Sequence, residues 1–147
     1  MPVSELDREA RTRDLARVLL VDDDVTSRLT LQTVLQAGGY GVEVAASAAE
    51  AIDKLEVGRY DLVLSELEME SPEAGLKVLA HARLQDYKPA TAIVKAFCDQ
   101  GHGAESAGDL VVAAEGVPNF LAKVADLIGL RATRRVHRQL RQLAPQA

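Results

Sequence analysis

The chain has 147 residues, a length that suits a single domain with a hydrophobic core of its own. Its 48% hydrophobic and 27% charged residues are ordinary for a globular protein, and no apolar run approaches the roughly 18 residues that a membrane helix requires. With one cysteine the chain can form no internal disulfide, so we expect a cytoplasmic location and no membrane partner.

The formal net charge of −5 is unevenly distributed. Residues 131–147 contain five arginines and no acid, so the remainder of the chain carries a charge of −10. A body of this acidity repels phosphate backbones, and nucleic acid is therefore disfavoured as a partner.

Apolar runs and helical patterns alternate along the first half of the chain. Residues 17–22 predict a buried strand, which a helix over 27–37 follows. A second strand is predicted at 42–46, and Ser47 with Glu50 three residues later is a capping box for a helix to residue 57. Residues 60–66, "YDLVLSE", predict a third strand that ends in an acid.

The alternation continues in the second half. A helix is predicted over 71–85, with Ser71 at its N-cap and Pro72 at its first position. A fourth strand is predicted at 90–97, only a poor helix in the glycine-rich segment 98–116, and a fifth strand at 119–122. A long final helix begins at about Val124 and runs into the basic segment.

Five strands that alternate with helices predict a doubly wound α/β fold, in which a parallel sheet is covered on both faces. Functional groups in such folds lie beyond the carboxyl ends of the strands. Five charged residues stand at or just past predicted strand ends, and we expect one pocket to collect Asp22, Asp23, Glu66, Lys95 and Lys123.

Four segments, in this order and spacing, carry a family resemblance: "VLLVDDD", "AGGYGVEVAASAAEAIDKL", "YDLVLSELEM" and "GVPNFLAK". Over about residues 17–130 the chain resembles the receiver domain of two-component response regulators, as in the single-domain chemotaxis receivers. The resemblance implies a flavodoxin-like (βα)5 fold with strand order 2-1-3-4-5. It further implies that Asp22 and Asp23 form the acidic pair, that Phe120 is the switch aromatic and that Lys123 is the pocket lysine.

The phosphorylation site departs from the family pattern. Glu66 stands where receivers have the phosphoacceptor aspartate, and Lys95 stands where they have threonine or serine. The extra methylene of glutamate moves the nucleophilic oxygens by up to about 1.5 Å, and a misplacement near 1 Å can cost on the order of 10²-fold in rate. Lys95 also removes a hydroxyl that would bind the phosphoryl group. We therefore expect a degenerate site that is not an enzyme and has no catalytic residue.

The pocket charges also differ from those of the family. Three carboxylates face two lysines, and we expect Lys95 to form an ion pair in place of a metal. Mg²⁺ binding should then be weak or absent, with Asp23 as the first candidate for a ligand. The alternative is that Lys95 extends from the strand end into solvent.

Two further functions stay open. "DDDVT" fits the D-x-D-x-T nucleophile signature of haloacid-dehalogenase-type phosphatases, in which Asp22 would attack phosphate and Asp24 would act as general acid. The other is a receiver that keeps residual metal binding and phosphotransfer.

We expect a stand-alone pseudo-receiver that works as a protein-interaction module in bacterial two-component or phosphorelay signalling. Its parts would be a charged extension at 1–16, the receiver-like domain at 17–130 and a basic helical extension at 131–147. Val136, Leu140 and Leu143 form an apolar stripe on that extension, which predicts a target protein or a homodimer. Glu66 either mimics a phosphorylated aspartate or is held inactive by Lys95.

Overall fold

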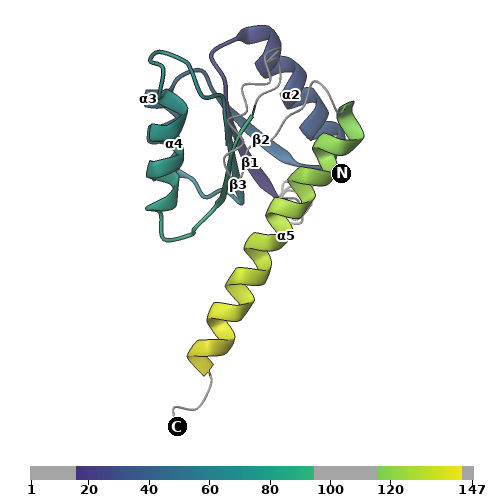
Figure 1. The fold of residues 1–147 in the computed structure, drawn as a ribbon, viewed down its shortest axis with the longest axis vertical. Coiled ribbons are helices and arrows are strands. Elements are labelled where there is room, and N and C mark those ends of the chain that lie inside the picture. Colours follow the sequence, from purple (N-terminus) through teal and green to yellow (C-terminus); the bar gives the residue numbers. More distant parts are fainter. Residues whose placement is uncertain (1–15, 95–115, 144–147) are drawn as a thin grey trace, which may run out of the picture.

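A computed structural model of the chain describes residues 16–94 and 116–143. Four strands and four helices lie in these ranges (Figure 1). The strands are β1 (Arg17–Val21), β2 (Gly41–Ala45), β3 (Leu62–Ser65) and β4 (Ala90–Ile93). The helices are α2 (Val25–Ala37), α3 (Ala48–Val57), α4 (Ala74–Arg83) and α5 (Gly116–Leu143).

The four strands form one parallel sheet in the order β2-β1-β3-β4. The predicted α/β class and the order 2-1-3-4 are therefore confirmed for the described strands. The register pairs Val21 with Ala45 on one side and with Ser65 on the other, so β1, β2 and β3 end at the same edge of the sheet. The predicted end of the fourth strand, at 95–97, lies outside the described residues.

The fifth strand predicted at 119–122 is wrong, because these residues lie in the first turns of α5. A four-residue apolar run has no periodicity that separates a buried strand from a buried helix. In the structure Phe120 and Val124, which are four residues apart, are both fully buried against the sheet. That spacing places them on one helical face.

Helices cover both faces of the sheet, with α3 and α4 on one face and α2 and α5 on the other (Figure 1). Successive residues of β1 alternate between the two cores. Val18 and Leu20 pack with Phe120 and α2, whereas Leu19 and Val21 pack with α3 and α4. The side chains of Val18 to Val21 are all completely buried, as expected of a central strand in a parallel sheet.

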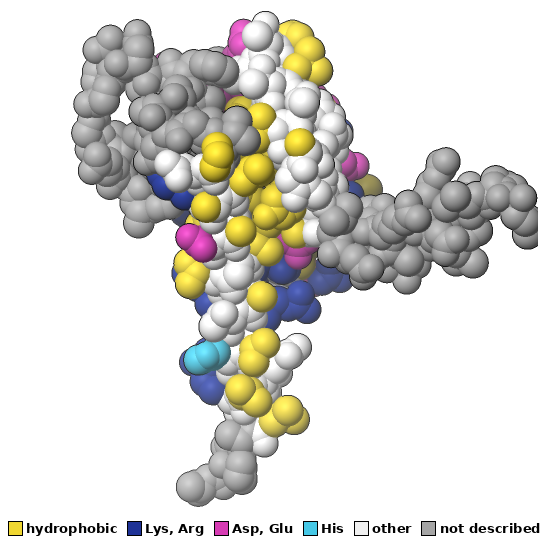
Figure 2. All heavy atoms as spheres, turned by 90° about the vertical axis from the view of Figure 1, so that its right-hand side faces the viewer, with side chains coloured by type: hydrophobic (Ala, Val, Ile, Leu, Met, Phe, Trp, Pro, Cys, Tyr) yellow, Lys and Arg dark blue, Asp and Glu magenta, His cyan; other side chains and the backbone are white. Residues whose placement is uncertain are grey.

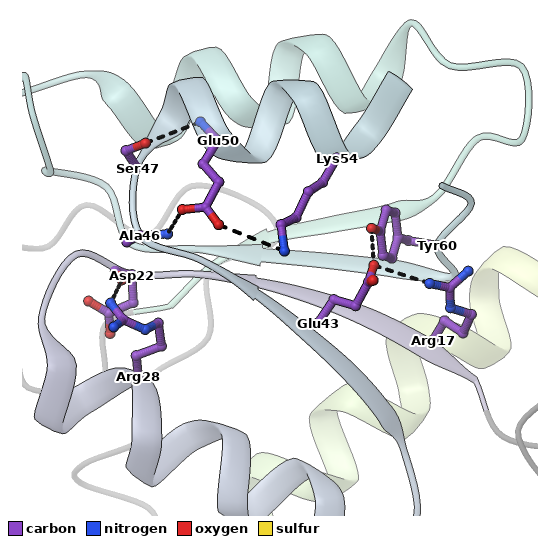
Figure 3. A network of polar contacts seen from close by, with 9 residues as sticks. All are labelled: Arg17, Asp22, Arg28, Glu43, Ala46, Ser47, Glu50, Lys54 and Tyr60. Carbon is purple, nitrogen blue, oxygen red and sulfur yellow. Dashed lines mark hydrogen bonds and ion pairs between the residues drawn. The ribbon is translucent and has the colours of Figure 1, made fainter. Parts of the chain in front are cut away.

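The start of α3 follows the prediction. Ser47 Oγ accepts a hydrogen bond from the Glu50 amide at 3.1 Å, and Glu50 Oε1 accepts one from the Ala46 amide at 2.9 Å (Figure 3). The predicted start of α4 is wrong. That helix begins at Ala74 and has no side-chain cap. Ser71 lies in a turn before it, where its carbonyl accepts hydrogen bonds from the amides of Met69 and Ala74.

Helix α5 extends well beyond the sheet (Figure 1). Every side chain from Ala132 to Leu143 is exposed, including those of Val136, Leu140 and Leu143. No helix in the described ranges is long and apolar enough to cross a membrane.

Candidate functional site at the carboxyl ends of the strands

The acidic loop after β1 begins with Asp22, whose side chain is 1% exposed. Its amide continues the sheet by donating to the Ala45 carbonyl at 3.0 Å, and its Oδ1 accepts a hydrogen bond from the Asp24 amide at 2.9 Å. The Arg28 guanidinium of α2 donates to the Asp22 carbonyl at 2.8 Å (Figure 3). Both the backbone and the carboxylate of Asp22 are therefore held in place.

The second oxygen of the Asp22 carboxylate differs from the first in its contacts. Asp22 Oδ2 and Ser27 Oγ are both buried, and neither has a hydrogen-bond partner within the described ranges. Burial raises the pKa of Asp22, and the charges of Asp23 and Asp24 add to the rise. The nearby Ser27 hydroxyl and the Asp24 amide oppose it, although Ser27 is not placed for a hydrogen bond of ordinary geometry.

Asp24 has a structural role at the start of α2. Its Oδ2 accepts a hydrogen bond from the Ser27 amide at 2.7 Å, which makes it the N-cap of that helix. A carboxylate in this position supports the turn that places Asp22 and Asp23. Asp23, between them, is exposed.

Glu66 immediately follows β3 and lies beside Asp22. Its amide donates to the Val21 carbonyl at 2.9 Å, which extends the register by one residue beyond the Val21–Ser65 pair. Burial raises the pKa of Glu66 to about 7, and the negative charges of Asp22, Asp23 and Asp24 contribute to the rise. The Leu67 amide, which hydrogen-bonds to the carboxylate, only partly offsets this. Glu66 is therefore about half protonated near neutral pH.

Gly75 fixes the loop that carries Glu66, and sequence reasoning did not identify it as a site residue. Its amide donates to the Leu67 carbonyl at 2.8 Å. A Cβ at this position would lie 2.0 Å from the Glu66 carbonyl oxygen and 2.8 Å from Leu67 Cα. Only glycine permits α4 to approach the backbone after β3 so closely.

Glu70 is a second residue that the sequence did not single out. Both of its carboxylate oxygens accept hydrogen bonds from the Ala48 amide at 2.9 Å, and one also accepts from Ala49 at 3.3 Å. The Ala48 amide is the main cause of the lowered pKa of Glu70. Glu70 thus ties the loop after β3 to the N-terminus of α3, where a helix favours negative charge.

The structure brings together three of the five predicted pocket residues: Asp22, Asp23 and Glu66. Lys95 lies outside the described residues. Lys123 is half-buried in α5, three residues after Phe120. Phe120, the predicted switch aromatic, is fully buried between α5 and the sheet.

The comparisons with known proteins agree with this fold. Residues 18–133 match the family model of the response regulator receiver domain, and the chain belongs to that family.

Among its curated relatives is the alginate biosynthesis transcriptional regulatory protein AlgB of Pseudomonas syringae pv. tomato, 33% identical over 137 residues. That match covers 92% of this chain and 29% of AlgB. The transcriptional regulatory protein ZraR of Escherichia coli K12 is 27% identical over 122 residues, which are 83% of this chain and 26% of ZraR. The chain therefore spans less than a third of the length of these relatives.

Solved receiver structures superpose on most of the chain. A CheY-like receiver domain protein from Methanospirillum hungatei matches with a TM-score of 0.67 at 21% identity, covering 82% of this chain and 98% of its own. The response regulator TrrA of Thermotoga maritima matches with a TM-score of 0.62 at 27% identity, covering 77% and 99%.

Receivers use Mg²⁺ at this position, and such an ion needs several oxygen ligands around it. Within residues 16–94 and 116–143, no group of three Asp, Glu, His or Cys side chains is arranged to hold a metal ion. The carboxylates are close enough to raise the pKa of Glu66, yet one of them, Asp24, is engaged as a helix cap.

Proposed function

We propose that this receiver domain acts as a protein-interaction module of bacterial two-component signalling, and that Glu66 does not accept a phosphoryl group. The observation that carries the proposal is the position of Glu66. It follows β3 directly and lies next to Asp22. The resemblance to receivers assigns the phosphoacceptor to this residue, whose side chain is one methylene longer than that of aspartate.

Two effects reduce the nucleophilicity of Glu66, and they differ in size. A pKa of about 7 leaves about half of the side chain neutral at pH 7, which is only a two-fold loss of the reactive carboxylate. The displaced oxygens cost on the order of 10²-fold, because reacting atoms must lie within about 3–3.5 Å of each other. The side-chain length is therefore the main barrier to phosphotransfer.

The raised pKa also bears on how Glu66 would act without phosphorylation. A phosphoryl group carries about −1.5 to −2 charges at pH 7, whereas a half-protonated Glu66 carries less than one. This favours an inactive conformation over mimicry of a phosphorylated aspartate. An ion pair with Lys95 would lower the pKa of Glu66 and ionise it, but the resulting single charge would still be smaller than that of a phosphoryl group.

The kind of partner is suggested by a relative. TrrA has also been solved in complex with the histidine kinase ThkA, and this second structure matches the chain at 26% identity with a TM-score of 0.64. We propose a signalling protein as the partner here as well. TrrA has also been solved with Mg(2+)-BeF, which makes a receiver with residual metal binding and phosphotransfer the second candidate.

A homodimer is proposed from α5. Val136 and Leu140 are 50% and 59% exposed on the protruding part of the helix, and Leu143 continues the same stripe. Aliphatic side chains at spacings of three and four residues pair well with a like helix.

The decisive experiment is intact-mass spectrometry after incubation with acetyl phosphate and Mg²⁺. We expect no phosphorylated species for the natural sequence and none for Glu66→Gln. The double variant Glu66→Asp/Lys95→Thr restores both family residues and is the positive control. Phosphorylation of the natural chain that maps to Glu66 would support the second candidate and overturn the first.

A further inference from the structure

A basic groove runs between α5 and the segment that leads into β4. It encloses about 1000 Å³. One wall is α5 from Leu127 to Arg141, and the other is formed by Arg83 and by residues 88–91. This groove lies at the amino ends of the strands, at the opposite edge of the sheet from Asp22 and Glu66.

The lining of the groove is strongly cationic. It contains six lysine and arginine side chains and no aspartate or glutamate: Arg83, Lys88, Arg131, Arg134, Arg138 and Arg141. The four arginines of α5 follow one another at intervals of three, four and three residues, which places them on one helical face. Arg135 is not part of the lining. Figure 2 shows Lys and Arg side chains gathered where α5 leaves the domain.

Little of this charge is neutralised by the protein. Arg131 forms an ion pair with Asp61 at 2.9 Å. In the described part of the chain, Arg134, Arg138 and Arg141 form no ion pair with an acid, and all three are exposed. Burial is the main cause of the lowered pKa of Arg131, and Asp61 opposes it. The charges of Arg135 and Arg138 lower the pKa further, so these guanidinium groups lie close enough to repel one another. A bound anion would relieve that repulsion.

The lining also has an apolar part, formed by Leu127, Leu130, Pro89 and Ala90, and Leu130 is 53% exposed. A ligand that filled the groove would therefore present carboxylate or phosphate groups to the arginines and apolar groups to these side chains. Along α5, the distance from Leu127 to Arg141 is about 21 Å at 1.5 Å per residue, enough for several residues of a polypeptide.

We propose that this groove binds an acidic segment of a partner protein that also carries apolar side chains. Guanidinium groups bind carboxylates in a two-pronged geometry, and apolar side chains of the segment would cover the apolar part of the groove. The phosphate backbone of a nucleic acid would offer no apolar group to the apolar part of the groove. This inference adds a class of partner, an acidic protein segment, to the proposed interaction module. It does not depend on whether Glu66 is phosphorylated.

Fluorescence anisotropy with the full chain tests the proposal. The probes are a labelled peptide of Glu-Glu-Leu repeats, a peptide of Glu-Glu-Ser repeats with the same length and charge, and a short DNA duplex. We expect the leucine peptide to bind more tightly than both other probes. Equal binding of the two peptides, tighter binding of DNA, or no binding of the leucine peptide would each overturn the proposal.

A matched pair of variants locates the site. Arg138 lines the groove and Arg135 does not, although both are exposed arginines of the same helix. Arg138→Gln should weaken binding of the leucine peptide by about five- to ten-fold, the effect of one lost charge-assisted hydrogen bond. Arg135→Gln should change it less than about two-fold. An equal loss in both variants would show general attraction to a basic helix and contradict the groove. Phosphorylation of Glu66 would overturn the proposed function but not this result.

Discussion

The guanidinium group of Arg131 in α5 forms an ion pair of 2.9 Å with Asp61, the residue that precedes β3. Arg131 is only 8% exposed, and it also donates to the carbonyls of Tyr87 at 2.7 Å and Lys88 at 2.9 Å. The other carboxylate oxygen of Asp61 accepts a hydrogen bond from the Arg17 amide at 2.7 Å. This pair therefore joins α5 to the starts of β1 and β3 and to the turn before β4.

Replacing Arg131 by methionine keeps most of the side-chain volume but leaves Asp61 and two carbonyls without their donor. We expect Arg131→Met to reduce the free energy of unfolding by about 2–4 kcal/mol, as measured by urea denaturation. Arg135→Met, on the exposed side of the same helix, should change it by less than about 0.5 kcal/mol. Equal urea midpoints for the two variants would show that the pair contributes nothing to stability.

Two glycines should respond to alanine with opposite signs. Gly75→Ala places a Cβ 2.0 Å from the Glu66 carbonyl oxygen, and we expect it to destabilise the fold by about 2–3 kcal/mol. Gly129 lies in α5, where an added Cβ would meet no atom within 4 Å, so Gly129→Ala should stabilise the fold by about 0.5–1 kcal/mol. Thermal or urea unfolding measures both. A neutral Gly75→Ala would mean that α4 can move away from the loop after β3.

The pKa of Glu66 predicts a pH dependence of stability with a defined sign. The pKa rises from 4.5 to about 7 on folding, so between these values the folded state binds more protons than the unfolded state. The contribution of Glu66 to the free energy of unfolding is fully present below about pH 4.5 and is lost as the pH rises through 7. Glu66→Gln should therefore be more stable than the natural chain at pH 8, by up to about 3 kcal/mol, and the difference should disappear at low pH.

Urea unfolding at several pH values, compared between Glu66→Gln and the natural chain, makes this measurement. Glu68→Gln is the control, because Glu68 is exposed two residues further along the same loop. The same pH profile in all three proteins would argue that Glu66 has an ordinary pKa.

Mg²⁺ should bind weakly in isothermal titration calorimetry. The ion requires near-octahedral oxygen coordination, and the longer side chain of Glu66 disturbs the geometry that an aspartate would give at this position. If Lys95 occupies the place of the metal charge, Lys95→Thr should strengthen binding, and adding Asp23→Asn should abolish the gain. Tight binding to the natural chain would contradict the proposed ion pair.

The apolar stripe of α5 predicts self-association. Leu140→Ser should lower the average mass in multi-angle light scattering, because it removes the centre of the stripe. Leu76→Ser is a matched control, since Leu76 is 50% exposed on α4 and Leu140 is 59% exposed on α5. If the natural chain is monomeric at high concentration, the prediction is wrong and the stripe is only the exposed end of a helix.

Much of the fold and part of the site could be predicted from the order of residues, because these features depend on short-range patterns. The alternation of apolar runs with helical periodicity predicted the four described strands and their parallel sheet, and Ser47 with Glu50 predicted the start of α3. The acids at the ends of two such strands predicted that Asp22 and Glu66 would lie side by side. That inference needs only the geometry of a parallel sheet, in which neighbouring strands end at one edge.

The remaining features depend on contacts between segments distant in sequence. Residues 119–122 have strand-like composition, but burial of Phe120 and Val124 on one face of α5 stabilises a helix there. Gly75 has no local signal, and its importance comes from the Glu66 carbonyl that lies against it. Arg131 resembles the other arginines of a charged tail until Asp61, seventy residues earlier in the chain, is brought to it. Packing energy and ion pairing act between residues that are close in space, and a linear pattern does not record that proximity.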